Sequence, residues 1–442
     1  MEAKIVSRSF PKPAGRLVRP AGFAFLAAGA LLAAAPLEPA FASAITAQSE
    51  GEPAGARWIR GGDDRAAQQL IGLLQSAGLD DLDPLNFNIK RLKRAVLAAE
   101  AGKPKAVAKA NALLDEALVA YVTALRQAPK GDWIINDRET IPAAPSPNQL
   151  LNDVMRSPSP ELWLKAMPFM HHGYAELRRA LAQAEALGDR RSADVLRINL
   201  RRVRFLPADG RYVLVNTAAQ KLYMYEDGRA VDEMRVVVGK AHQPTPMMAA
   251  TIKFTALNPY WQVPADLAAE RVAPNVVKHG LSYLKDNGYV LLSDWGDHAR
   301  PVDPSTVDWE AVASGRVLVR LRQDPGPHNA MGRMKFMFPN PQGIYLHDTP
   351  NKELLNEEAR LFSGGCVRLE DAPRLAKWMH GRPLSWRGAG TEQPVDLRAP
   401  VPVYLIYQTA VPNGNQVVYY EDIYGKDRSM LAGASEGRVA AR

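Results

Sequence analysis

The chain has 442 residues and a net charge of +8, from 55 lysines and arginines against 47 aspartates and glutamates. This length allows two domains of ordinary size. The lack of basic runs with interleaved aromatic residues argues against a nucleic-acid partner. No residue pattern indicates a metal or an organic cofactor. The single cysteine, Cys366, excludes an internal disulfide.

The first 42 residues have the pattern of a secretory signal peptide. Basic residues precede an apolar run, and small residues that fit a cleavage site follow it. These features are Lys4, Arg8, Lys12, Arg16, Arg19, the run 21–35 and either Ala40-Phe41-Ala42 or Ala42-Ser43-Ala44. The run is shorter than the roughly 20 apolar residues of a spanning helix, which disfavours a retained membrane anchor. We therefore predict a cleaved signal over residues 1–42 and a mature protein in the periplasm.

Residues 43–209 carry the apolar spacing of helices, because apolar residues recur at steps of three and four. One such face comprises Leu113, Leu114, Leu118, Tyr121, Val122 and Leu125, and another comprises Leu177, Leu181, Ala184 and Leu187. A proline-rich stretch at 141–149 interrupts the helical pattern and indicates a surface connection. We predict an α-helical scaffold domain over 43–209, in which no catalytic pattern is recognisable.

From about residue 210 the pattern changes to the alternation typical of strands. Runs rich in Val, Tyr, Ile and Phe occur at 211–216, 221–240, 251–257, 317–322, 334–339, 344–348, 401–411 and 416–425. Asp227-Gly228 divides the second run and indicates a hairpin turn. We predict a β-rich domain over 210–427, followed by a disordered tail over 428–442.

The strand pattern is interrupted between Pro264 and Gly315 by a helical piece and by a stretch rich in glycine, aspartate and proline. An interruption of this length in a compact sheet is usually a lid or a binding loop. We predict such a lid-like insertion over residues 265–316.

The stretch FSGGCVRLED, residues 362–371, places Cys366 after two glycines and before an expected helix with Asp371 as its cap. The cysteine count alone leaves open a buried inert thiol, an intermolecular disulfide and a reactive nucleophile. A nucleophile needs amide donors for an oxyanion. Gly364 and Gly365 allow a tight turn that could bring the N–H groups of Gly365 and Cys366 to one point.

A nucleophilic thiol also needs a base, and His347 is the best placed of the eight histidines, because it ends an apolar strand 19 residues before Cys366. If the two groups meet, imidazolium and thiolate would hold each other charged near neutral pH. His347 could equally be an ordinary strand end. Arg368 should point to the same side as the cysteine, where it could bind a substrate carboxylate or pair with Glu370 or Asp371.

Two long strings, QDPGPHNAMGRMKFMFPNPQGIYLHDTP and RLFSGGCVRLEDAPRLA, resemble the catalytic signature of the L,D-transpeptidases, the YkuD-type peptidoglycan cross-linking enzymes. VGKAHQPTP (238–246) and NPYWQVP (258–264) resemble motifs of the large, YcbB-like subgroup. The resemblance covers about 210–380. It implies an α+β protein in which a mixed β-sandwich catalytic domain follows the helical domain, with 265–316 as its substrate-covering insertion.

The resemblance further implies that Cys366 attacks a peptide carbonyl while His347 serves as base and then as acid. The third residue of a tetrapeptide stem would form a thioester, D-alanine would leave, and an amine of a neighbouring stem would complete a 3→3 cross-link. The implied substrate-binding residues are Arg368, Tyr345, Trp261 and Ser363, and the implied partners are peptidoglycan stem peptides.

The chain departs from the family pattern at two places. Many members read Ser-His-Gly-Cys where this chain has Gly364, which we expect to alter pocket shape without abolishing the chemistry. The connection 188–194 is too short for the wall-binding module of many YcbB-like enzymes. Hydrolysis by the same thioester route, attachment of an envelope protein to the wall, and a non-catalytic wall-binding scaffold stay open as alternatives.

Overall fold

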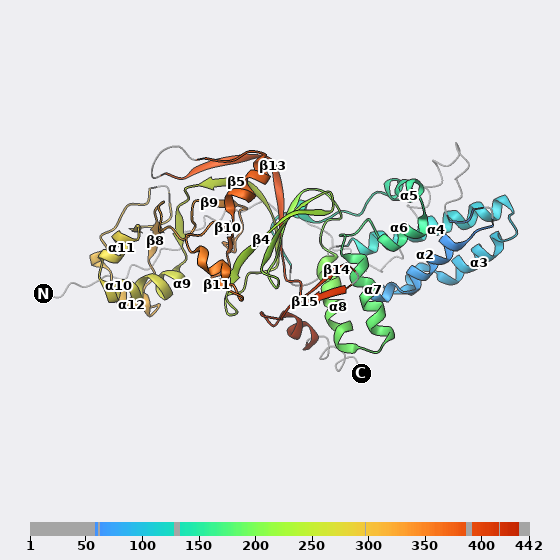
Figure 1. Ribbon diagram of the computed structural model, residues 1–442, viewed down its shortest axis with the longest axis horizontal. Coiled ribbons are helices and arrows are strands. Elements are labelled where there is room, and N and C mark those ends of the chain that lie inside the picture. Colours follow the sequence, from blue (N-terminus) through green and yellow to red (C-terminus); the bar gives the residue numbers. More distant parts are fainter. Residues whose placement is uncertain are drawn as a thin grey trace, which may run out of the picture. The chain divides into compact units, whose positions relative to one another are not determined.

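The computed structural model describes residues 58–60, 62–127, 133–296, 298–385, 391–414 and 416–432. The predicted signal peptide and residues 433–442 of the predicted tail lie outside these ranges. In Figure 1 the helices α2–α8 (blue to green) form one cluster, and a mixed sheet follows along the chain, so the predicted α+β fold is confirmed. Within the described ranges, no helix combines the length and apolar character needed to cross a bilayer.

The N-terminal region consists of α-helices with short 3₁₀ turns between them. They are α2 (Arg65–Gln75), η1 (Ala77–Asp80), η2 (Pro84–Phe87), α3 (Ile89–Ala99), α4 (Pro104–Leu125), η3 (Arg138–Thr140), α5 (Pro147–Arg156), α6 (Pro160–Ala166), α7 (Tyr174–Ala186) and α8 (Arg190–Val203). The six residues predicted to share one face of α4 are all buried. On α7 the prediction is wrong for Leu187, which is 75% exposed because it follows the last helical residue.

The main sheet closes into a ring. Its strands are β2 (Tyr212–Asn216), β3 (Lys221–Glu226), β4 (Arg229–Gly239), β5 (Met248–Leu257), β9 (Met334–Met337), β10 (Leu346–His347), β12 (Val367–Leu369) and β13 (Gln393–Ile406). They pair in the order β5-β13-β2-β3-β4-β12-β10-β9, and the last strand, β9, also pairs with the first, β5, which closes the ring. Two short strands add to it, β1 (Ile134–Ile135) on β5 and β11 (Leu361–Ser363) on β4. Parallel pairs (β2–β13 and β10–β12) occur beside antiparallel ones, so the ring is mixed.

Alternation along the strands separates two cores. Val213, Val215, Val403 and Leu405 lie inside the ring with Leu375 and Met379 of α13 (Ala372–His380). Tyr212, Leu214, Tyr404 and Ile406 point outward from the same strands and join the core of the helical region. The hairpin predicted at Asp227-Gly228 is confirmed, since both residues have positive φ angles of 48° and 74°, as a type I′ turn requires.

The insertion has a core of its own. Residues 265–316 contain the strand β7 (Tyr289–Leu292) and the helical segments α9 (Ala265–Leu267), η4 (Ala268–Val272), α10 (Ala273–His279), α11 (Ser282–Asp286), η5 (Pro304–Thr306) and α12 (Trp309–Ala313). The strand β7 forms one sheet with two flanking strands, β8 (Arg320–Gln323) and β6 (Trp261–Val263). Leu267, Val276, Trp309 and Leu321 pack together between these elements. The segment thus folds around apolar residues and is not a plain loop.

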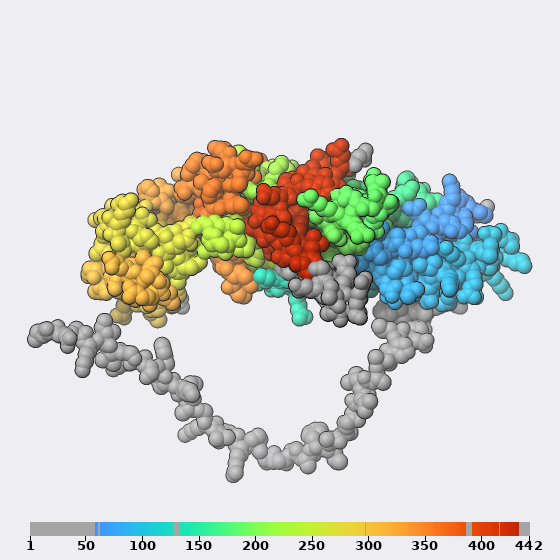
Figure 2. Space-filling model, turned by 90° about the horizontal axis from the view of Figure 1, so that it is seen from below, coloured from blue at the N-terminus to red at the C-terminus, as the bar shows by residue number. Residues whose placement is uncertain are grey.

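The C-terminal part returns to the helical region. Strands β14 (Ala410–Asn413) and β15 (Gln416–Tyr419) form a hairpin, and Figure 2 shows this part (red) beside the green helices. Residues 426–432 are helical, so the predicted disorder is wrong for 428–432. The physical reason is a buried contact, because Arg202 of α8 holds Asp427 by an ion pair and Met430 by a hydrogen bond to its sulfur.

Candidate active site

Three neighbouring strands place charged and titratable side chains in one row. On the parallel strands β10 and β12, His347 lies opposite Arg368, and on the antiparallel strand β9 it lies opposite Lys335. The adjacent pair Leu346 and Val367 belongs to the interior core. Since successive side chains of a strand point to opposite faces, His347, Arg368 and Lys335 share the outer face of the ring.

Cys366 lies on the same face, one residue before β12. The amide of Val367 donates to the carbonyl oxygen of Tyr345 at 2.9 Å, which sets Cys366 beside Tyr345. The half-buried thiol donates to the carbonyl oxygen of Gly343 at 3.5 Å, and no hydrogen bond joins it to His347. The structure therefore brings Cys366, His347, Arg368 and Tyr345 together, as predicted, with the thiol turned toward Gly343.

The orientation of the His347 ring defines its tautomer. Nδ1 lies 2.5 Å from the carbonyl oxygen of Asp348, which can only accept, so Nδ1 carries the proton and Nε2 is the free base. Burial, with His347 2% exposed, lowers its pKa to about 3, and the charge of Arg368 adds to this. The ring is therefore neutral at physiological pH.

The thiol is neutral as well. Burial raises the pKa of Cys366, and an amide hydrogen bond from Tyr345 and the charges of Lys335 and Arg368 oppose this only in part. The ion pair predicted between His347 and Cys366 is therefore wrong for the resting site. The prediction rested on the mutual attraction of the two charges, whereas in the folded protein burial disfavours the charged form of both groups.

Two cations of the site have no acidic partner at hydrogen-bond distance within the described residues. Arg368 pairs with neither acid that was considered for it, since Glu370 binds Arg235 at 2.6 Å and Asp371 accepts the Arg374 amide at the start of α13. Lys335 places its ammonium 4.4 Å from the centre of the Tyr345 ring. Burial lowers the pKa of both cations. This face is thus suited to an anionic ligand.

Lys335 did not emerge from the sequence as a site residue. It is one of several lysines in β-rich stretches, and only the register of β9 on β10 places it opposite His347. Across the described residues, no group of three or more His, Cys, Asp or Glu side chains is arranged to hold a metal.

The loop before Cys366 is held by Ser363. The hydroxyl of Ser363 donates to the Cys366 carbonyl at 2.5 Å and accepts the Gly365 N–H at 3.1 Å. Of the two predicted oxyanion donors, only the Cys366 N–H is without an acceptor among the described residues. Gly365 has a φ of +115°, and a β-carbon there would lie 2.9 Å from Cδ1 of Ile344, so the turn requires glycine.

The insertion meets this loop at Gly364. A β-carbon at Gly364 would touch the methyl groups of Leu267 at 3.4 Å and Oε1 of Gln243 at 3.5 Å. Arg271 of the insertion also donates to the Phe362 carbonyl at 3.2 Å. A larger residue at position 364 would therefore press on the insertion. Trp261 packs against the insertion core and is not in the row with Cys366 and His347.

Replacing Lys335 by methionine should make the thiol harder to ionise, because the ammonium favours the thiolate. We expect iodoacetamide to alkylate Cys366 about tenfold more slowly at pH 7, and the midpoint of the pH profile to move upward. Lys335→Arg should keep the wild-type profile, and so should Lys253→Met on the exposed face of β5. Equal profiles for Lys335→Met and wild type would contradict this electrostatic role.

Two family models match parts of this chain. Residues 210–403 match the family model described as L,D-transpeptidase catalytic domain (YkuD), and residues 54–181 match that of the Scaffold domain. A Haemophilus influenzae protein named "Putative L,D-transpeptidase" is 35% identical over 243 residues, which are 53% of this chain and 48% of that protein. The chain thus spans about half the length of this curated relative.

Two solved structures are similar to part of the chain. They are "Structure of the Ldtfm-avibactam carbamoyl enzyme" and "L,D-transpeptidase from Mycobacterium smegmatis", each 14% identical with a TM-score of 0.22. The first match covers 46% of this chain and 51% of that structure, and the second covers 44% and 58%.

Proposed function

We propose that this protein is a peptidoglycan L,D-transpeptidase of the YcbB-like subgroup. The chain contains an L,D-transpeptidase catalytic domain and a Scaffold domain. The observation that carries the proposal is the shared face of β10 and β12, where a cysteine, a histidine with a free Nε2 and an arginine lie together, the arginine having no acidic partner among the described residues. A thiol beside a neutral imidazole is the pair that acyl transfer through a thioester needs.

The first half-reaction follows from the protonation states. As Cys366 Sγ attacks the carbonyl carbon of the third stem residue, its proton passes to Nε2 of His347. The developing oxyanion accepts the Cys366 N–H. The imidazolium then gives its proton to the leaving amine of D-alanine, the amide C–N bond breaks, and the third residue stays on sulfur as a thioester.

The second half-reaction reverses these roles. An amine of a neighbouring stem attacks the thioester carbon and gives a proton to His347, which returns it to the leaving sulfur. The product is a 3→3 cross-link and the free thiol of Cys366. The neutral resting pair suits this cycle, because the whole cycle starts and ends with an uncharged thiol and a neutral imidazole.

The charge of the site supports a stem peptide as ligand. Stem peptides carry free carboxylates, and a guanidinium without an acidic partner binds a carboxylate in fork geometry. We assign this role to Arg368, with Lys335 as a second cation and Tyr345 and Ser363 at the borders of the site. Trp261 would contact the ligand only from the insertion side.

Three alternatives differ in the fate of the thioester or in its existence. Water as acceptor would make the enzyme a carboxypeptidase or endopeptidase, and an envelope-protein amine would tether that protein to the wall. The insertion approaches the loop at Gly364 through Leu267 and holds Phe362 through Arg271, and exclusion of water from the thioester is what decides between transfer and hydrolysis. A non-catalytic scaffold would need neither the free Nε2 nor the thiol beside it.

We further propose that the protein is exported through a signal peptide over residues 1–42 and works in the periplasm. The proposal rests on the residue pattern at the N-terminus. The periplasm is also where the stem peptides are found.

Incubation with a purified tetrapeptide muropeptide tests the function. We expect D-alanine and 3→3 cross-linked dimers, separated and identified by chromatography and mass spectrometry. Tripeptide monomer alone would identify hydrolysis, and a protein joined to a tripeptide stem in a parallel incubation that also contains envelope proteins would identify tethering. Unchanged tetrapeptide in the presence of folded protein would refute acyl transfer to peptidoglycan stems.

A further inference from the structure

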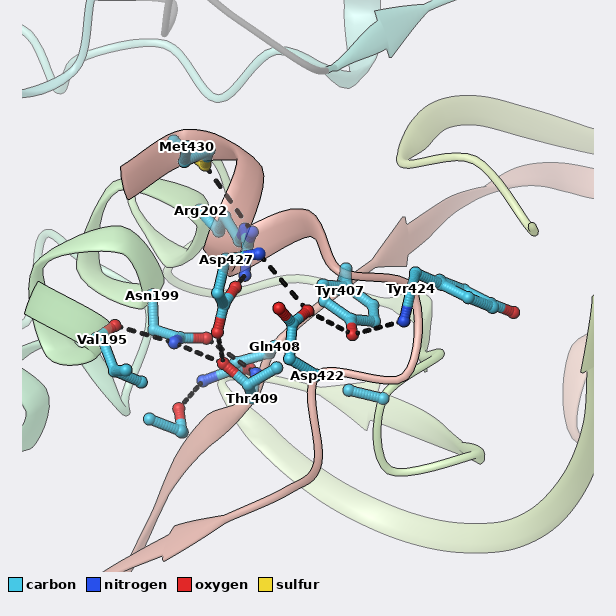
Figure 3. Close-up of polar contacts among 12 residues, drawn as sticks. Val195, Asn199, Arg202, Tyr407, Gln408, Thr409, Asp422, Tyr424, Asp427 and Met430 are labelled. Atoms are coloured by element: carbon cyan, nitrogen blue, oxygen red, sulfur yellow. Dashed lines mark hydrogen bonds and ion pairs between the residues drawn. The ribbon is translucent and has the colours of Figure 1, made fainter. Parts of the chain in front are cut away.

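The C-terminal segment, residues 416–432, is anchored to the helical region by buried polar contacts. Arg202 of α8 and Asp427 form an ion pair at 2.6 Å, with side chains only 3% and 7% exposed (Figure 3). The second oxygen of Asp427 accepts the Thr409 hydroxyl at 2.5 Å, and Asn199 donates to Thr409 at 2.8 Å. Removing one partner of such a buried pair is strongly destabilising. The Arg202–Asp427 pair therefore holds the C-terminal segment against α8.

A second set of contacts sets the direction of Tyr424. The Tyr407 hydroxyl donates to Asp422 at 2.8 Å and accepts the Tyr424 N–H at 3.0 Å. The rings of Tyr407 and Tyr424 stack with centroids 5.3 Å apart. Figure 3 shows the Tyr424 ring directed away from the Arg202–Asp427 pair. The segment therefore presents one tyrosine hydroxyl at a defined place.

That hydroxyl reaches the support of the nucleophile loop. Tyr424 donates to the Gly239 carbonyl at 2.8 Å, and Thr245, which is 1% exposed, accepts the Gly239 N–H at 2.9 Å. The Thr245 hydroxyl donates to the carbonyl of Gly365 at 2.7 Å. Gly365 is the residue before Cys366, so a short series of hydrogen bonds joins the C-terminal segment to the loop of the thiol.

We propose that Tyr424 is a positioning residue for Cys366, acting through Gly239 and Thr245 on the Gly365 carbonyl. The Arg202–Asp427 pair fixes the segment that carries Tyr424 to the helical region, which gives this region a part in placing the nucleophile. The inference rests on the proposed function in so far as Cys366 is the nucleophile. Burial raises the pKa of Tyr424 to about 12, so its hydroxyl stays a donor at neutral pH.

Tyr424→Phe in the full chain tests this, because it removes the hydroxyl and keeps the stacked ring. We expect acylation of Cys366 by a carbapenem, followed by mass spectrometry, to slow by about tenfold, the effect of losing one well-placed hydrogen bond. The matched control is Tyr420→Phe in the same segment, whose hydroxyl makes no hydrogen bond with the described residues. The control should react at the wild-type rate, and thermal melting should show both variants folded.

The route through Thr245 is tested by a double-mutant cycle. Thr245→Val should slow acylation at least as much as Tyr424→Phe, while Thr245→Ser should restore the rate. If Tyr424 acts through Thr245, Tyr424→Phe should add less than twofold in the Thr245→Val background. Independent, multiplicative effects would overturn this route.

A second readout separates this inference from the proposed function. Alkylation of Cys366 by iodoacetamide needs no transpeptidase chemistry, and its pH profile reports the surroundings of the thiol. If wild type fails to react with carbapenem, the proposed function fails, and the profile still decides on Tyr424. A profile of Tyr424→Phe that differs from that of Tyr420→Phe supports the positioning role, and identical profiles together with identical acylation rates overturn it.

Discussion

Cys366→Ala should abolish both carbapenem adduct formation and muropeptide conversion, with a loss of about ten-thousandfold or more. The reason is that the attacking atom itself is removed, and removal of a catalytic nucleophile in comparable acyl-transfer enzymes costs this much or more. Cys366→Ser should be nearly as inactive, because a hydroxyl is a weak nucleophile at its ordinary pKa. The measurement is the rate of D-alanine release together with the mass of the intact protein.

The chain offers a clear control for this experiment, since Cys366 is its only cysteine. Any thiol-dependent mass increase in wild type must therefore lie on Cys366. Alanine is smaller than cysteine and the position is only half-buried, so the variant should keep the melting temperature of wild type within a few degrees. Folded Cys366→Ala that still releases D-alanine at the wild-type rate would refute the thioester mechanism.

His347→Gln should slow acylation by about a thousandfold at pH 7, the usual contribution of a general base. A base is required because burial keeps the thiol of Cys366 protonated. His347→Asn is the matched control, because its amide nitrogen takes the place of Nδ1 and can still donate to the Asp348 carbonyl, so an equal loss in His347→Gln should report the proton acceptor and not the hydrogen bond. The variant should regain activity as the pH rises toward the pKa of the thiol, whereas wild type should vary little above pH 6.

The same histidine should affect stability at low pH. The pKa of His347 is about 3 in the folded protein and near its ordinary 6.5 in the unfolded chain, so between these values the unfolded state binds more protons. The contribution of neutral His347 to the free energy of unfolding is therefore full above pH 6.5 and is lost as the pH falls toward 3. Melting curves at pH 7 and pH 4 should therefore differ less for His347→Gln than for wild type. If the melting temperatures of wild type and His347→Gln differ equally between pH 7 and pH 4, the pH dependence of stability does not come from the burial of His347.

The outcome for individual elements indicates which properties a sequence carries by itself. The face of α4 and the turn at Asp227-Gly228 were predicted correctly, because both depend on residues that are close in the chain. The error at Leu187 arose at a helix end, where periodicity continues beyond the last hydrogen-bonded turn. The helical residues after 428 were missed because their order depends on Arg202, far earlier in the chain.

The site divides in the same way. That Cys366 and Arg368 share a face follows from strand alternation alone, His347 was chosen for its place at a strand end before Cys366, and the family resemblance supplied Tyr345. The register of β9 on β10 then added Lys335, which has no local signal. The hydrogen bond from the Gly365 amide to Ser363 removed one of the two predicted oxyanion donors.

The sequence by itself determined the helical and β-rich regions, the insertion and the identity of the thiol and imidazole, because periodicity and motif spacing are local properties of the chain. Only the tertiary structure decided that both groups are neutral at rest, that Lys335 stands beside them and that Tyr424 supports their loop. Burial sets a protonation state, and the burial of His347 depends on the sheet that places β9 and β12 on either side of it. Closing the ring of strands is the step that brings these parts together.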